Sequence, residues 1–432
     1  MPEQLTPTEA VARLHPADSL GIPLGPGHPP TFLHALGARD DWTALEVSGA
    51  LLTDLYAVFT KPGVRYFSGF FGPAERVLRD LGADIAFVPA DFRRFAPILE
   101  ALRPRVMATV GAPPDRDGHV SLSLHAGATV AELHRAGADP DRTLIVEVSD
   151  RFPRTVGLPP DHLHRLHLDE IDILVESDAA PFVLADAAPT EADRAIAEIA
   201  RRFVHDGCTL QTGIGAIPTA VATLLADGPG GDYGIHSEMF TTGLMSLHRA
   251  GKIANRKGIF DGFSVTTFAL GTPELYEWLR DNSDVRFLPV DIVNSPDVIA
   301  RNHSMVSVNA ALAVDLYGQA VADMLDHKQF SGIGGHEDFI AVSGHELEDR
   351  SLVCLHATAT VDGEVRSRIV AGFEYGTVIT TPRHHLDVVI TEFGAAELRG
   401  RTVRQRALAL AEIADPRFRD DLRARAAAIP EA

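Results

Sequence analysis

Glu238 is the residue whose surroundings in this chain best suit chemistry. It lies in the segment GIHSEMF, residues 234–240, where a glycine and small, apolar or uncharged polar side chains flank one carboxylate. No Lys or Arg lies between Gly230 and Leu247. An acid in such a setting is either a structural hydrogen-bond acceptor or a nucleophile that stays able to react. The neighbouring His236 permits a general-base role, and the alternative is an ordinary loop histidine.

A first glycine loop lies in the segment QTGIGAIPTAV, residues 211–221, between a predicted strand and a predicted helix at Ala220–Leu225. Gly213 and Gly215 allow a tight turn and the close approach of a ligand to the backbone. Pro218 suits the first turn of a helix. Backbone N–H groups at such a helix start can bind phosphate or another anion, and the alternative is an ordinary strand-to-helix turn. The spacing is neither GxGxxG nor a Walker loop, so it predicts neither dinucleotide nor nucleoside triphosphate binding.

A second glycine loop lies in SGIGGHEDF, residues 331–339. Gly332, Gly334 and Gly335 permit unusual backbone angles and expose N–H groups. Paired N–H donors of this kind can stabilise an oxyanion that develops during acyl transfer. The alternative is a plain tight turn.

Two further segments carry charges that invite a functional reading. Glu392 follows a predicted strand at Val388–Thr391, and the carboxyl end of a parallel strand is where α/β proteins keep ligand contacts. A structural loop acid is the alternative. Lys252, Arg256 and Lys257 stand close together in sequence, either as a patch for a phosphate-bearing ligand or as a solvated loop.

Composition limits the classes of partner. The formal net charge of -20 argues against broad binding to nucleic acid or to anionic membranes, although a small anionic ligand needs only a local set of donors. The polar N-terminus shows no signal pattern, and no apolar run approaches the roughly 20 residues of a membrane span. We therefore expect a cytoplasmic protein that binds neither nucleic acid nor membrane.

The candidate metal-binding residues form no convincing set. Cys208 and Cys354 have no framework or metal spacing, and we expect two buried, reduced thiols. His162, His164 and His167 are spaced more like ligands, but no Cys or carboxylate completes the set. The segment around Glu238 is not H-E-x-x-H, which excludes a zinc protease of that type. We expect no metal and no prosthetic group.

The fold predicted to position these segments is α/β, with largely parallel sheets flanked by helices. Apolar runs of strand length alternate with helical patterns, which favours βαβ units. The predicted strands are 85–89, 106–110, 144–148 and 171–175 in the first half and 209–211, 285–290, 339–342 and 388–391 in the second. Predicted helices cover 127–136, 191–203 and much of 403–432, with Thr190 and Asp193 as a capping pair. The prolines and lost periodicity near 178–190 predict two domains, residues 1–185 and 190–432.

Several strings in this order resemble the acetyl-CoA hydrolase/transferase family, which includes 4-hydroxybutyrate and butyrate/acetate CoA-transferases. The strings are PPDRDGHVSL, VEVSDRFPRTVG, QTGIGAIPTAV, GIHSEMF, SVNAALAVDLYGQA, SGIGGHEDF and VITEFGAAELRGRTVRQRA. They cover most of the chain, while the first 60 residues match loosely and His336-Glu337-Asp338 depart from the family pattern. The resemblance implies two CoA-transferase-like α/β domains, the second carrying the nucleophilic glutamate.

The resemblance also assigns residues. It implies that Glu238 is the nucleophile, with Asn309 and Gly335 as further catalytic residues. It implies CoA contacts from both glycine loops, at Gly213, Ile214, Gly215, Ala216, Ile217, Ser331, Gly332 and Gly334. It also implies a supporting role for Glu392 in the cofactor site. The implied partners are acyl-CoA and small carboxylic acids, with CoA as a substrate, in a homo-oligomer that is a dimer or larger.

The implied reaction is transfer of CoA from a short-chain acyl-CoA to a free carboxylic acid through a glutamyl-CoA thioester. Glutamate suits covalent ping-pong catalysis, because its usual pKa near 4.3 leaves a carboxylate at pH 7. Two alternatives stay open. One is an acyl-CoA hydrolase that uses the same Glu238 with water as acceptor, and the other is a non-catalytic ligand-binding regulator on the same fold.

Overall fold

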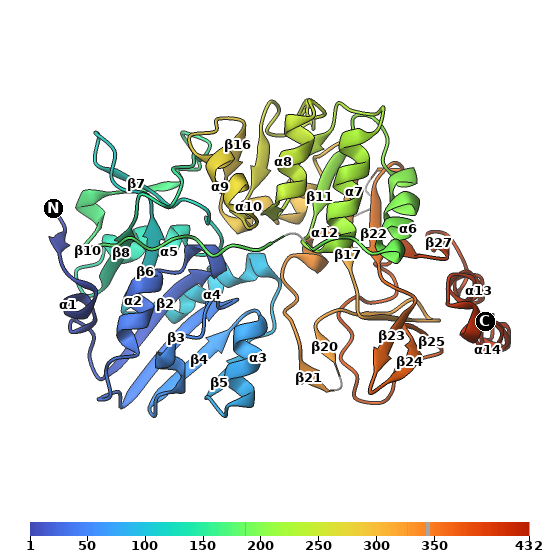
Figure 1. The fold of residues 1–432 in the computed structure, drawn as a ribbon, viewed down its shortest axis with the longest axis horizontal. Coiled ribbons are helices and arrows are strands. Elements are labelled where there is room, and N and C mark those ends of the chain that lie inside the picture. Colours follow the sequence, from blue (N-terminus) through green and yellow to red (C-terminus); the bar gives the residue numbers. More distant parts are fainter. Residues whose placement is uncertain (186, 326, 343–345, 432) are drawn as a thin grey trace. The chain divides into compact units, whose positions relative to one another are not determined.

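The computed structural model describes residues 1–185, 187–325, 327–342 and 346–431. The chain forms two compact units. The first comprises residues 1–184, 238–240 and 263–295, and the second comprises 185–237, 241–262 and 296–432. Figure 1 follows the chain through both units from blue to red. Glu238 therefore belongs to the first unit and both glycine loops to the second.

The first unit is built on an eight-stranded sheet in which every neighbouring pair is parallel. Its strands, in sheet order, are β1 (Glu3–Gln4), β10 (Ile173–Glu176), β8 (Thr143–Val148), β6 (Val106–Gly111), β2 (Ala17–Leu24), β3 (Ala44–Ala50), β4 (Val64–Ser68) and β5 (Ile85–Phe87). The helices between them are α1 (Pro7–Val11), α2 (Pro30–Leu36), α3 (Pro73–Asp80), α4 (Phe95–Leu102) and α5 (Val130–Gly137).

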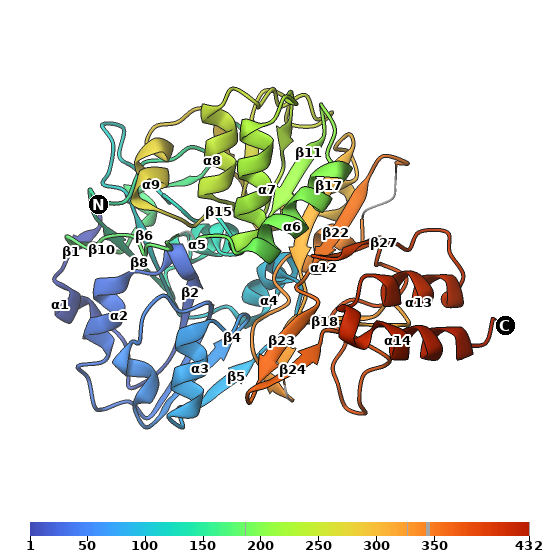
Figure 2. The same ribbon diagram turned by 45° about the vertical axis from the view of Figure 1, so that its right-hand side comes forward.

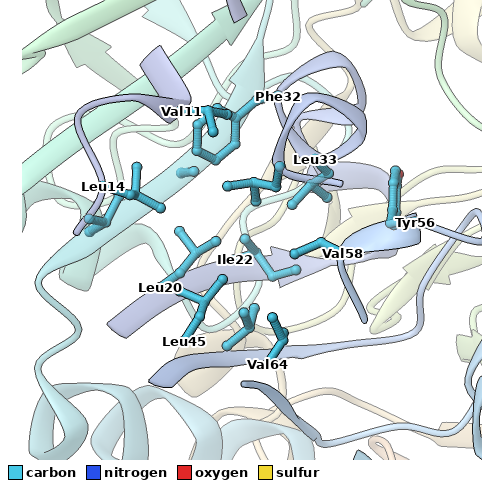
Figure 3. Packing of buried hydrophobic residues seen from close by; sticks show 14 of the residues in the cluster. Val11, Leu14, Leu20, Ile22, Phe32, Leu33, Leu45, Tyr56, Val58 and Val64 are labelled. Atoms are coloured by element: carbon cyan, nitrogen blue, oxygen red, sulfur yellow. The ribbon is translucent and has the colours of Figure 1, made fainter. Parts of the chain in front are cut away.

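Helices of the first unit are fixed to this sheet by an apolar core, shown in Figure 3. Phe32 and Leu33 of α2 pack with Leu20 and Ile22 of β2, and all four side chains are at most 1 % exposed. Each such side chain contributes roughly 1.5–3 kcal/mol when it leaves water. The central strands β6 and β8 are buried along almost their whole length, as expected for strands inside a parallel sheet.

Smaller elements complete the first unit beside the segment of Glu238. Two parallel pairs lie here, β13 (Met239–Phe240) with β15 (Phe268–Ala269) and β14 (Ser264–Thr266) with β16 (Val285–Phe287). The helices α9 (Pro273–Leu279) and α10 (Val290–Val293) follow in the chain, and β7 (His119–Ser121) pairs with β9 (Arg165–His167).

The second unit has a six-stranded sheet that is parallel except for its last pair. Its strands, in order, are β12 (Gly234–Ile235), β11 (Thr209–Thr212), β17 (Met305–Ala310), β22 (Arg350–Cys354), β26 (Val388–Thr391) and β27 (Gly394–Glu397). Three helices pack beside one another along it, α6 (Glu191–Ala200), α7 (Ala216–Asp227) and α8 (Thr242–Arg249), as Figures 1 and 2 show. The capping box of Thr190 and Asp193 at the start of α6 is confirmed.

The rest of the second unit consists of short helices, hairpins and a C-terminal helix pair. The pair of α13 (Val403–Glu412) and α14 (Pro416–Ala428) is visible in Figure 2 and confirms the predicted helical end. The other elements are α11 (Pro296–Ile299), α12 (His336–Ile340), β18 (Ala313–Asp315), β19 (Ala320–Val321), β20 (Met324–Leu325), β21 (Lys328–Gln329), β23 (Thr358–Val361), β24 (Glu364–Ser367) and β25 (Ile369–Val370).

The predicted α/β class, with largely parallel sheets flanked by helices, is confirmed. One predicted strand, 339–342, is wrong, because these residues fall in and after the helix α12. Phe339 and Ile340 are buried, and Phe339 packs with Ile299 and Met305. A short apolar run on the buried side of a helical turn has the same residue types as a buried strand, which explains the wrong prediction. The run 285–290 is a strand only to Phe287, since Pro289 ends it and α10 begins at Val290.

The predicted domains are residues 1–185 and 190–432. The compactness of the two units does not test whether each predicted domain folds independently. The division therefore stays a prediction. Both cysteines are buried and unpaired with each other, and burial raises the pKa of the Cys208 thiol to about 11. Among the helices that the structure describes, none is long and apolar enough to cross a membrane.

Candidate active site

The backbone of Glu238 is fixed by three donors from one stretch of chain in the first unit. Its carbonyl oxygen accepts hydrogen bonds from the Thr267 N–H at 3.0 Å, the Phe268 N–H at 3.2 Å and the Thr266 hydroxyl at 2.9 Å. Glu238 lies in the chain between β12 and β13, and the residue is only partly buried. A carboxylate on an anchored backbone, reachable from solvent, has the placement that a nucleophile needs.

The carboxylate of Glu238 is oriented by an amide that the sequence did not indicate. Asn294, which directly follows α10, donates from Nδ2 to Glu238 Oε2 at 2.7 Å and is 0 % exposed. A hydrogen bond to a charged group contributes roughly 1.5–3 kcal/mol. Because the donor is a neutral amide, it fixes the direction of the carboxylate and leaves its negative charge in place. Asn294 thus joins the candidate catalytic residues.

An apolar cluster surrounds this part of the first unit. Met239 packs against buried side chains that include Phe268, Leu270 and Val290. His125 lies 6.2 Å from Phe268 between ring centroids, and burial lowers the pKa of His125 to about 3. His125 is therefore neutral at pH 7 and adds no positive charge to the cluster.

The residue that precedes Glu238 is bonded to the residue that precedes the first glycine loop. Within the second unit, the Ser237 hydroxyl accepts from the Thr212 N–H at 3.3 Å and donates to the Thr212 carbonyl at 3.2 Å. His236 is buried and meets Phe339 edge-on at 6.3 Å between ring centroids. The segment before Glu238 is therefore held firmly to β11.

The first glycine loop presents its backbone to solvent. A Cβ at Gly213 would meet no atom within 4 Å, and Ile214 is 45 % exposed. Gly215 has a φ of +121°, which only glycine adopts easily, and α7 begins at the next residue. The N–H groups of Ala216 and Ile217 stand in the first turn of α7, where a helix offers them no internal partner. The geometry suits an anionic or polar ligand.

Asn309 lies beside the strand that leads into this loop. Its Nδ2 donates to Gln211 Oε1 at 3.2 Å, across the parallel pair β11–β17. The structure therefore places Asn309 beside Gln211, on the strand that leads into the first glycine loop.

The second glycine loop ends in the short helix α12. Gly334 has a φ of +57°, and Gly335 is the residue before the first helical residue. Glu392, expected in a supporting role, accepts from the Ala357 N–H at 2.8 Å through Oε2, which ties the ends of β26 and β22 together. This contact is structural, and the supporting role expected of Glu392 in binding CoA stays a prediction.

A phosphate patch of three side chains, one of the two interpretations weighed for the basic segment, does not fit, because Lys257 is buried. Lys257 is 0 % exposed, and its Nζ donates to the Phe260 carbonyl at 3.1 Å. Burial lowers the pKa of Lys257 to about 7. Lys252 donates to the Gly228 carbonyl at 2.6 Å, and only Arg256 of the three is exposed. A solvated loop is therefore also wrong for Lys257.

Metal ligation has no candidate in the described part of the chain, where no group of three or more His, Cys, Asp or Glu side chains could hold an ion. His164, one of the three histidines weighed for this role, is buried and bonds the Ser123 carbonyl through Nε2 at 2.7 Å.

Comparison with known proteins gives consistent matches. The family model for the acetyl-CoA hydrolase/transferase C-terminal domain matches residues 271–426. The chain is 35% identical over 423 residues to a succinyl-CoA:cyclohexane-1-carboxylate CoA transferase of Geobacter metallireducens, covering 96% of this chain and 93% of the relative. It is 38% identical over 310 residues to a 4-hydroxybutyrate coenzyme A transferase of Clostridium kluyveri, covering 72% and 69%. The crystal structure of RipA from Yersinia pestis matches with a TM-score of 0.88 at 32% identity, covering 98% of this chain and 97% of that one.

Proposed function

Since the chain belongs to the acetyl-CoA hydrolase/transferase family and is an enzyme of the CoA-transferase type, we propose that it moves CoA between a short-chain acyl-CoA and a free carboxylic acid, with Glu238 as the nucleophile. The observation that carries this proposal is the Glu238 carboxylate, partly exposed, anchored through its backbone and oriented by Asn294 at 2.7 Å.

The proposed reaction balances without a proton or a cofactor. A Glu238 oxygen attacks the thioester carbonyl, the C–S bond breaks, and CoA leaves as a thiolate, so a mixed anhydride joins Glu238 to the acyl group. The thiolate attacks the Glu238 carbonyl, which releases the first carboxylate and forms a glutamyl-CoA thioester. A second carboxylate repeats these two steps in reverse, giving a new acyl-CoA and free Glu238.

The amide of Asn294 orients the Glu238 carboxylate before the first of these reaction steps. Its hydrogen bond to Oε2 fixes the direction in which the Glu238 carboxylate points, which supports the proposed attack on the thioester. We propose that Asn294 is a positioning residue for the attack, in addition to Asn309, which the resemblance assigned to catalysis and which the structure pairs with Gln211.

The two glycine loops supply the proposed contacts to CoA. Exposed backbone at Gly213, Ile214 and Gly215 and the first turn at Ala216 and Ile217 support a role in binding CoA. Binding energy from the long CoA molecule, away from the reacting atoms, can be used to lower the barrier at the thioester.

The second loop, Ser331 to Gly335, is proposed to stabilise the oxyanion through backbone N–H groups. Each such donor contributes roughly 2.7–4 kcal/mol in known oxyanion holes. Within this loop Gly335 is the proposed catalytic position, Ser331, Gly332 and Gly334 complete the backbone around it, and Glu392 supports the neighbouring strand end.

Hydrolysis of acyl-CoA is the second candidate, because the matching family includes both activities. The two differ in whether water or a second carboxylate attacks the glutamyl-CoA thioester. Incubation of acetyl-CoA or butyryl-CoA with and without a panel of short carboxylic acids separates them. A new acyl-CoA that depends on the acid supports the transferase, and free CoA that is released at the same rate without acid supports the hydrolase.

Glu238 itself is tested by trapping. Borohydride reduces a glutamyl thioester to an alcohol, which peptide mass spectrometry locates. We expect acyl-CoA-dependent reduction at Glu238, its loss in Glu238→Gln together with turnover, and no effect of Glu277→Gln, an exposed glutamate of α9 in the same unit. Full turnover by Glu238→Gln would refute the proposal.

Association and location complete the proposal. We expect a homodimer or larger oligomer in the cytoplasm, which mass measurement in solution and cell fractionation test.

A further inference from the structure

We infer that two neighbouring residues, Thr380 and Thr381, clamp the two ends of the second glycine loop and, with Glu337, act as positioning residues for the acyl-transfer step. The inference rests on the proposed function, in which this loop holds the oxyanion. All the contacts lie within the second unit, and none of these three residues was among the expected site residues.

The start of the loop is held through Asp323. The Ser331 N–H donates to the Asp323 carbonyl at 2.9 Å, and Gln329 Nε2 donates to Asp323 Oδ2 at 3.0 Å and to the Ser331 carbonyl at 2.8 Å. The Thr380 hydroxyl donates to Asp323 Oδ1 at 2.5 Å. The same Thr380 oxygen accepts from the Ala322 N–H at 2.8 Å. Thr380 therefore fixes the carboxylate around which the loop begins.

The end of the loop is held through Glu337, two residues after Gly335. The Thr381 hydroxyl donates to Glu337 Oε1 at 2.5 Å, and His385 Nδ1 bonds Glu337 Oε2 at 2.9 Å. His336 Nε2 lies 2.8 Å from the Thr381 hydroxyl oxygen. Thr381 is 0 % exposed and the Glu337 side chain 14 %, so water competes little for these bonds.

The directions of these hydrogen bonds follow from the chemistry of the groups. A carboxylate only accepts, so the single hydroxyl proton of Thr381 is given to Glu337. His336 must then donate from Nε2 to the Thr381 oxygen, which assigns the proton of that ring to Nε2. Burial lowers the pKa of His336, consistent with a neutral ring that donates through one nitrogen.

The threonine pair is itself fixed to the strand β19. The N–H groups of Thr380 and Thr381 both donate to the Ala320 carbonyl at 3.0 Å, and the Ala320 N–H donates to the Thr381 carbonyl at 3.0 Å. These backbone hydrogen bonds fix the positions of both threonine residues. The hydroxyl of Thr380 contacts Asp323, which holds the start of the loop, and the hydroxyl of Thr381 contacts Glu337, just after its end.

A clamp at both ends suits a loop that contains three glycines. Glycine loses more backbone entropy on ordering than any other residue, so an unrestrained loop would sample many conformations. Restraint at Asp323 and at Glu337 limits the directions that the intervening N–H groups can take. Donors fixed in advance stabilise an oxyanion without reorganisation during the reaction.

The test compares Thr381→Val, which keeps the size and removes the hydroxyl, with Thr381→Ser, which keeps the hydroxyl. The first readout is hydrogen exchange of peptides covering residues 331–335, and the second is kcat and KM for acyl-CoA. Thr209→Val is the matched control, because it removes a buried hydroxyl that donates to the His303 carbonyl in the same unit and away from the loop.

We expect Thr381→Val to raise loop exchange and to lower kcat by roughly 10- to 100-fold, with KM changed less than about threefold. Thr381→Ser and Thr209→Val should stay near wild type. If Thr381→Val does not fold, Glu337→Gln tests the same bond from the other side and should shift both readouts in the same direction.

Unchanged loop exchange in Thr381→Val, or raised exchange with unchanged kcat, would overturn the inference. The exchange readout needs no activity, so it distinguishes failure of the clamp from failure of the proposed function. A wild-type enzyme without transferase activity would refute the latter alone.

Discussion

Replacing Lys257 by methionine should stabilise the protein at neutral pH, and the gain should shrink as the pH rises. Lys257 is 0 % exposed in the second unit, and its Nζ donates to the Phe260 carbonyl at 3.1 Å. Burial lowers its pKa from 10.5 to about 7, and the nearby Asp261 offsets only part of this effect. The folded state therefore releases the lysine proton more readily than the unfolded chain does.

The size of the effect follows from the two pKa values. Between pH 7 and pH 10.5 the unfolded chain binds more protons at this site, so the free energy of unfolding rises with pH across that window. At 1.36 kcal/mol per pH unit, the penalty is about 4 kcal/mol at pH 7 and about 1 kcal/mol at pH 9.5. Loss of the hydrogen bond to Phe260 subtracts about 1 kcal/mol from the gain at every pH.

Urea unfolding of wild type and Lys257→Met at several pH values measures this difference. The variant should be more stable by about 3 kcal/mol at pH 7, with a difference that falls by about 3 kcal/mol towards pH 9.5. Other titrating groups cancel, because they are common to both proteins. Arg256→Met is the control, because it removes an exposed basic side chain from the same segment. A difference that is independent of pH would refute the reasoning.

Two further outcomes are expected. Asn294→Leu should lower the rate of Glu238 acylation in single turnover by roughly 10- to 100-fold, and Asn294→Asp should lower it further; an unchanged rate in both would remove Asn294 from the mechanism. Burial raises the pKa of Glu75 from 4.5 to about 7, so the folded state binds this proton more tightly than the unfolded chain does. The stability that protonated Glu75 contributes is therefore lost as the pH rises through 7. Glu75→Gln should gain roughly 2 to 3 kcal/mol in free energy of unfolding relative to wild type between pH 5 and pH 8. Urea unfolding measures this gain, and a difference that does not change with pH would contradict the reasoning.

Four strands of the first sheet, β5, β6, β8 and β10, could be predicted from the sequence because their runs are almost wholly apolar. Its strands β2, β3 and β4 could not, because polar residues interrupt their apolar runs. Val106–Gly111 and Thr143–Val148 illustrate the predictable strands, with apolar runs and buried side chains in the centre of the first sheet. The run 339–342 fails the same rule for a physical reason. Its buried residues are also apolar, but Gly334 and Gly335 turn the chain into a helix, and four residues cannot reveal a period.

The candidate site divides in a similar way. Glu238 and the glycine loops could be named because their residue types and short spacings carry the signal. Asn294 could not, because it stands 56 residues from Glu238 in a segment with no distinguishing pattern, and only the fold brings its amide to the carboxylate. Lys257 was named from the sequence, but its surroundings could not be predicted. A basic residue in a glycine-bounded segment gives no sign that its side chain is fully buried.

The choice of an amide beside Glu238 explains why Asn294→Asp should be worse than Asn294→Leu. A hydrogen bond from an amide to a charged carboxylate contributes roughly 1.5–3 kcal/mol, which is enough to orient the carboxylate. This energy is small compared with the roughly 8–23 kcal/mol by which enzymes commonly lower activation barriers. Leucine removes the orientation but leaves the charge of Glu238 alone. Aspartate of nearly the same shape would place a second carboxylate where Nδ2 now lies, 2.7 Å from Glu238 Oε2. Two carboxylates so close favour sharing one proton, and a protonated Glu238 cannot attack the thioester.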